Sequence, residues 1–111
     1  MEIHINAINH PDINHIHEFC DLELTKSLEA YPFISTAWIT VTRQETTPQP
    51  LYEVTLKVHP SNSDPMVTQD TNISDEQAVK AVLKKMRKPL RKYKELHYAS
   101  SHRNKNMLGG S

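Results

Sequence analysis

Four segments of the chain have the composition or the two-residue alternation of β-strands. They are residues 2–8, 33–42, 51–59 and 66–73. Prolines between the second and third segments, and directly after the third, predict turns, because proline has no N–H to donate to a strand ladder. The fourth segment is the most polar, and we expect Val67 and Ile73 to anchor it to the core.

Two further segments repeat their apolar residues every three or four positions, which is the period of a helix. The first starts at about Asp12 or Asn14 and ends near Ala30. Asp12 is a suitable N-cap, and Pro32 prevents the helix from continuing, because the residue before a proline is pushed out of the helical region.

The second helical segment is the clearest feature of the pattern. It follows Ser74, which has Gln77 at the spacing of a capping box, and runs to about Leu96. Pro89 lies inside it, lacks an N–H and collides with the carbonyl four residues earlier, so we expect a bend over Lys85–Pro89. The apolar stripe predicted to be buried is Val79, Val82, Leu83, Met86, Leu90 and Tyr93.

The predicted order of elements is β-α-β-β-β-α. This order indicates an α+β fold, in which two helices pack on one face of a four-stranded, mostly antiparallel sheet. We expect residues 1–97 to form this domain and residues 98–111 to be a flexible C-terminal tail, because the apolar period ends there.

Composition agrees with one soluble domain: 111 residues, with 13 Lys and Arg against 13 Asp and Glu. No apolar run approaches the length of a membrane span, and the N-terminus MEIHINAINH does not resemble a signal peptide, so we expect a cytoplasmic protein without a membrane partner. Cys20 is the single cysteine, which excludes an intramolecular disulfide.

The zero net charge hides a strong division of charge along the sequence. Residues 1–74 sum to −7 and residues 75–111 to +7. A basic segment of this kind points to a polyanion-binding surface, because a phosphate backbone responds to the nearest basic face more than to distant charges.

The basic residues gather on the predicted solvent side of the second helix. Eight of them occur within fifteen positions without one acidic residue, and they are the candidate RNA-binding residues: Lys80, Lys84, Lys85, Arg87, Lys88, Arg91, Lys92 and Lys94. A basic helix face is often no more than a hydrated surface. Here the uncompensated repulsion between neighbouring turns destabilises the helix and favours a binding role.

No combination of residues predicts a catalytic site, a cofactor or a small-molecule substrate. The residues considered as metal ligands are His10, His15, His17 and Cys20, but Cys20 belongs to an apolar stripe and no recognised spacing is completed. The aromatic residues Phe33, Trp38 and Tyr52 could stack on bases. On strands, such side chains more often pack in the core or on the sheet surface.

Two RNA-binding families have the predicted element order. The double-stranded RNA-binding domain has a glycine-containing loop before its second helix, whereas this chain has only Gly109 and Gly110. The chain more closely resembles the bacterial ribosome hibernation-promoting factors, also called ribosome-associated inhibitors, from Met1 to about Leu96. MEIHINAI is similar to their first strand, and EFCDLELTKSLEAYPFIS to their first helix and second strand.

The second helix carries the strongest resemblance. The family pattern Lys-Leu-x-Arg-Gln-Leu-x-Lys-x-Lys corresponds here to residues 85–94, KMRKPLRKYK. In that family the domain fills the channel for mRNA and tRNA in the small ribosomal subunit. The resemblance implies that Lys85, Lys88, Lys92 and Lys94 contact rRNA.

The chain also departs from the family. Its first helix has Lys26 as its only basic residue among four acidic ones, Glu18, Asp21, Glu23 and Glu29. Pro89 replaces the glutamine of the pattern, residues 74–79 differ from the usual start of the second helix, and the C-terminal dimerisation domain of the long form is not found. We therefore expect a short, divergent member.

Three functions follow from these observations. The first is binding of small-subunit rRNA through the basic helix, which silences translation under stress. The second is a regulatory or protein-interaction module that keeps the fold but has lost rRNA binding. The third, a small hydrolase or metal enzyme, has no motif to support it, and we expect a protein that is not an enzyme.

Overall fold

The computed structural model describes residues 1–99 and contains the predicted elements in the predicted order. They are β1 (Glu2–Ile8), α1 (Ile13–Leu28), β2 (Ile34–Gln44), β3 (Leu51–Pro60), β4 (Met66–Asn72), α2 (Asp75–Lys94) and a short π-helical extension, η1 (Glu95–Ala99). From residue 100 on, the segment expected to be a tail lies outside the described residues.

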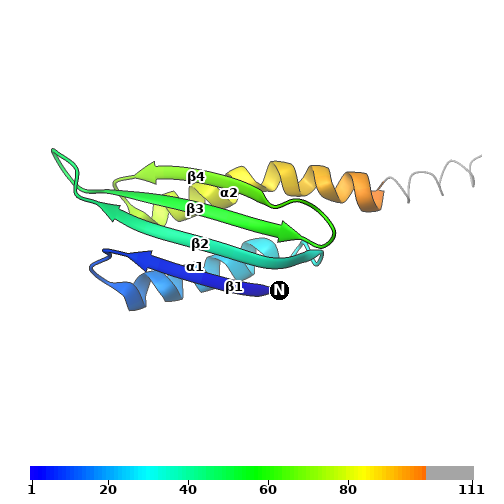
Figure 1. Cartoon of the computed structure of the whole chain (residues 1–111), viewed down its shortest axis with the longest axis horizontal. Coiled ribbons are helices and arrows are strands. Elements are labelled where there is room, and N and C mark those ends of the chain that lie inside the picture. Colours follow the sequence, from blue (N-terminus) through cyan, green and yellow to red (C-terminus); the bar gives the residue numbers. More distant parts are fainter. Residues whose placement is uncertain (100–111) are drawn as a thin grey trace, which may run out of the picture.

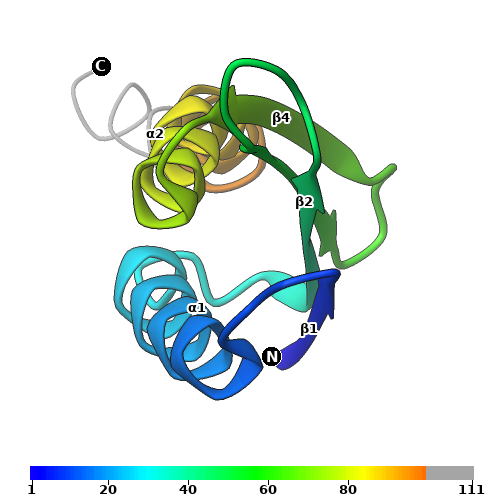
Figure 2. The same cartoon turned by 90° about the vertical axis from the view of Figure 1, so that its left-hand side faces the viewer.

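The four strands form one sheet in the order β1-β2-β3-β4. β1 pairs with β2 in parallel, because α1 carries the chain back across the sheet, and the other two pairings are antiparallel. Both helices lie on the same face of the sheet (Figures 1 and 2). The predicted α+β fold is confirmed.

One hydrophobic core lies between this face and the helices. Alternate residues of the two central strands enter it, for example Ile39 of β2 and Leu56 of β3, and both are fully buried. From α2 come Ala78 and all six apolar residues predicted for its inner stripe. The helical period read from the sequence therefore identifies the buried side of α2 correctly.

The ends of the helices are set by local hydrogen bonds. Asp12 caps α1 by accepting a bond of 3.2 Å from the N–H of His15, as expected. Ser74 caps α2 by accepting from the N–H of Gln77 at 3.3 Å. The reciprocal bond of a capping box is absent within residues 1–99, because the Ser74 N–H donates to the side chain of Asn72 at 3.0 Å.

The predicted anchoring of β4 is wrong. Val67 and Ile73 are 59% and 58% exposed, and the side of β4 that faces the helices carries Met66, Thr68 and Asp70. Polar side chains can lie there because α2 satisfies them: the Thr68 hydroxyl donates to the Val82 carbonyl at 2.9 Å.

α2 remains one α-helix from Asp75 to Lys94, with Pro89 inside it. Met86 and Leu90, on either side of Pro89 in sequence, are buried. The bend expected at this proline stays a prediction, as does the weakening of the helix that follows from the missing N–H.

A matched pair of valines tests which side of β4 faces the core. Val58→Ala removes two fully buried methyl groups and should lower the free energy of unfolding by about 2 kcal/mol. Val67→Ala, on the neighbouring strand but exposed, should change it by less than about 0.5 kcal/mol. Urea unfolding followed by circular dichroism measures both, and equal losses would contradict the observed register.

Replacing Pro89 tests how much this proline destabilises α2. Pro89→Gln restores an N–H donor and should raise the free energy of unfolding by about 1 to 3 kcal/mol. Pro65→Gln, in the exposed turn before β4, is the control and should not stabilise the protein, because a proline in a turn restricts the unfolded chain. A stability of Pro89→Gln equal to that of the wild type would show that the helix absorbs the proline at no cost.

Candidate nucleic-acid interface

All eight basic residues predicted as a binding face are exposed on α2. The opposite side of the helix is buried on the sheet, so the charged side chains leave the helix on its solvent side. Both ends of α2 are fixed: at its C-terminal end the Tyr93 hydroxyl donates to the Ser61 carbonyl at 2.8 Å.

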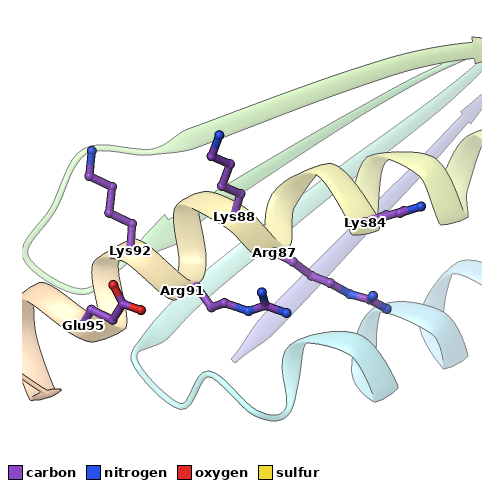
Figure 3. Close-up of a pocket in the computed structure, with 6 residues that line it drawn as sticks. All are labelled: Lys84, Arg87, Lys88, Arg91, Lys92 and Glu95. Atoms are coloured by element: carbon purple, nitrogen blue, oxygen red, sulfur yellow. The ribbon is translucent and has the colours of Figure 1, made fainter.

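The basic residues extend to two sides of the helix. In Figure 3, Lys84, Arg87 and Arg91 point to the side where α1 lies, and Lys88 and Lys92 point away from it. A shallow pocket between them is lined by Lys84, Arg87, Lys88, Arg91, Lys92 and Glu95. Five cationic side chains and one carboxylate around one depression form a site suited to anionic groups such as phosphates.

A second depression follows the seam between the two helices. Lys26, the single basic residue of α1, lines it together with Lys80, Lys84 and Arg87 of α2, and Glu23 lies among them. α1 therefore contributes one positive and one negative charge to this seam. The small basic contribution expected of α1 is located here.

Lys85 differs from the other basic residues. Its ammonium group donates to the Gln69 carbonyl at 2.8 Å and to Asp70 Oδ1 at 3.1 Å, so it ties α2 to β4. Lys88, Lys92 and Lys94, the other positions that the resemblance assigns to rRNA contact, make no hydrogen bond or ion pair within residues 1–99.

Two histidines hold the start of α2. The side chain of His10 is 3% exposed, and its Nε2 lies 2.6 Å from Asp75 Oδ2. The Nε2 of His15 lies 2.7 Å from Glu76 Oε2. The Nδ1 of His10 accepts from the N–H of Asp12 at 2.9 Å, so its Nε2 carries the proton that is donated to Asp75.

These two pairs were missed from the sequence, which presented the histidines as possible metal ligands. Their partners lie 65 and 61 residues away, and no local spacing signals such a contact. Asp75 and Glu76 also occupy the first turn of α2, where negative charge is favourable for the helix dipole.

No group of three or more potential metal ligands occurs in the described part of the chain. Burial raises the pKa of the Cys20 thiol to about 12, so Cys20 is a neutral thiol in the core at neutral pH. Among residues 1–99, no helix combines the length and the apolar character needed to span a membrane.

Among the solved structures similar to this chain are two that span most of it. A ribosomal subunit interface protein from Coxiella burnetii superposes with a TM-score of 0.67 at 18% identity, covering 85% of this chain and 98% of the other. The chain has the fold of a ribosomal subunit interface protein. The N-terminal domain of Protein Y from Thermus thermophilus gives a TM-score of 0.60 at 10% identity, with 84% and 99% covered.

The resemblance inferred from the sequence is therefore confirmed for the fold. Comparison with family models gives no match, and comparison with curated protein sequences gives none either. The fold is thus shared with proteins of very different sequence.

The pair His15 and Glu76 predicts a dependence of stability on pH. The hydrogen bond to Glu76 raises the pKa of His15 above its ordinary value, because it favours the charged imidazolium. Because the pKa of His15 is higher in the folded than in the unfolded protein, the pair stabilises the fold. The stabilisation is complete below the pKa of the unfolded state, about 6.5, and is lost as the pH rises through the pKa of the folded state.

Thermal unfolding at about pH 5.5 and about pH 8.5 measures the effect. His15→Gln should lose less stability than the wild type over this interval. His17→Gln is the control and should follow the wild type, since His17 is exposed on the same helix and makes no hydrogen bond or ion pair within residues 1–99. Identical pH profiles for wild type and His15→Gln would refute the contribution of the pair.

Proposed function

We propose that the protein binds the small ribosomal subunit through the basic face of α2, contacts rRNA there and silences translation under stress. The observation that carries this proposal is the set of eight exposed cationic side chains on one rigidly packed helix. The fold shared with a ribosomal subunit interface protein supports the ribosome as the partner.

The chemistry of the interface is the neutralisation of phosphates. Arg87 and Arg91 can each offer two parallel N–H donors to a phosphate, while Lys88 and Lys92 act as mobile point charges. Each contact releases condensed counterions, so binding should weaken steeply with salt. Because the helix is held at both ends, its backbone is already ordered before binding, and little backbone entropy is lost when RNA binds.

The protein silences translation by occupying a channel of the ribosome and not by catalysing a reaction. A domain placed in the channel of the small subunit excludes mRNA and tRNA while it is bound, as the resemblance implies. We therefore infer a binding protein that is not an enzyme and needs no cofactor.

A second candidate function is a regulatory or protein-interaction module that has lost rRNA binding. It is favoured by the acidic residues of α1 and its C-cap, of which Glu18, Asp21 and the C-cap Glu29 are exposed. α1 packs beside α2, and Glu23 lies in the seam with Lys80, Lys84 and Arg87, so this carboxylate weakens the attraction of the basic face for a polyanion. The two functions differ in whether the basic face binds ribosomes.

Charge reversal on α2 distinguishes them. Lys88→Glu, Arg91→Glu and Lys92→Glu, combined in one protein, should abolish co-sedimentation with small ribosomal subunits. Lys85 is left unchanged, because a glutamate there would face Asp70 and destabilise the fold. For the wild type, the logarithm of the affinity should fall with the logarithm of salt with a slope of about −0.7 to −0.9 per phosphate contact.

The matched control conserves charge at the same positions: Lys88→Arg, Arg91→Lys and Lys92→Arg should retain binding. Circular dichroism confirms that each variant is folded. Co-sedimentation of the charge-reversed variant at the wild-type level would refute the assignment of the interface. No binding by the wild type at low salt would favour the second function.

A further inference from the structure

The face of the sheet opposite the helices is open. α1 and α2 both lie on one side, and no element within residues 1–99 covers the other (Figure 2). Because side chains alternate along a strand, the residues between the core positions point to this open face. Trp38 of β2 is at its centre, half-buried among neighbours on the adjoining strands.

Three aromatic rings from three strands lie together on this face. His4 is directly opposite Trp38 in the register of β1 and β2, and their ring centroids are 5.9 Å apart with planes inclined by 15°. On the other side of Trp38 lies His59 of β3, and the centroids of these two rings are 6.5 Å apart. We define these three residues as the aromatic platform.

A cation lies over the aromatic platform, at the ring of Trp38. Lys57 of β3 is opposite Trp38 in register, and its Nζ is 5.1 Å from the centre of the indole ring. At the other end, Glu2 Oε2 lies 3.3 Å from His4 Nε2. The positive charge is therefore at the β3 side of the platform and the negative charge at the β1 edge.

Next to the platform runs a row of polar side chains. Asn6, Thr40, Thr55 and Gln69 are consecutive partners across all four strands, and they alternate with core residues, so they share the open face with Trp38. Amide and hydroxyl groups of this kind donate and accept hydrogen bonds. The face thus combines an aromatic surface, a cation and a line of hydrogen-bonding groups.

We propose that this open face is a second binding site and that it takes unpaired bases of single-stranded RNA. A base takes the place of the Lys57 ammonium group over Trp38 and stacks there, and the polar row contacts the edge of this base. The displaced Lys57 then pairs with the phosphate backbone, away from Glu2. Stacking of bases on aromatic side chains of a sheet is a recurrent mode of single-strand recognition. The amide and hydroxyl groups of the polar row supply the donors and acceptors that the edge of an unpaired base requires.

This site goes beyond the interface on α2, since it lies on the opposite face of the sheet and uses different residues. Phosphates of structured rRNA suit the basic helix, whereas the open face requires bases that are not paired. The two sites can therefore be tested separately.

Trp38 is the single tryptophan, so its fluorescence reports directly on the platform. Titration of the full-length protein with a short oligoadenylate, which has unpaired adenines, should quench this fluorescence to a plateau. With a labelled oligoadenylate, anisotropy should show binding weakened by about five- to a hundred-fold in Trp38→Ala. Trp38→Phe keeps an aromatic ring and should retain most of the affinity.

The α2 variant with Lys88→Glu, Arg91→Glu and Lys92→Glu separates this proposal from the proposed function. Loss of ribosome binding with retained quenching of Trp38 supports two independent sites. An unchanged fluorescence of the wild type at saturating oligoadenylate overturns the proposal, and so does equal affinity of the wild type and a folded Trp38→Ala. Reduced ribosome binding by Trp38→Ala without any quenching by oligoadenylate would assign the face to a ribosomal contact other than unpaired bases, and this also overturns it.

Discussion

The burial of one apolar stripe of α2 on the sheet is the constraint on which the rest of the structure depends. Val79, Met86 and Leu90 are fully or almost fully buried, and the period of the helix then leaves every basic residue on the solvent side. Repulsion among those charges opposes the helix, and burial of the stripe offsets it. The hydrogen bond from Tyr93 and the histidine pairs at the first turn keep α2 fixed at both ends.

Features encoded by local spacing were predictable. The element order, the inner stripe of α2, the caps at Asp12 and Ser74 and the exposure of the basic residues all follow from periods or signals within a few residues. β4 was misread because Val67 and Ile73 are its most apolar candidates, although polar residues can face a helix when its backbone and Lys85 satisfy them. A strand with few apolar residues has no reliable phase in its sequence alone.

The candidate interface shows the same limit. The sequence identifies the basic residues, but it does not show that they diverge to two sides of α2, or that Lys85 is engaged by β4. It also separates His10 from Asp75 by 65 residues, and only the fold brings them together. Contacts of this kind depend on tertiary packing. They decide which charges are available to a partner and which serve to hold the domain together.

The order of the elements along the chain has a consequence for biosynthesis. Within residues 1–99, α2 is the last long element, and it covers the part of the sheet formed by β3 and β4. While the chain is being made, the inner face of these strands stays without its cover until residues 75–94 have emerged, and the contacts of His10 and Ser61 with α2 must also wait. The positions of the basic side chains are therefore established only after residues 75–94 have been made, later than the strands on which α2 packs.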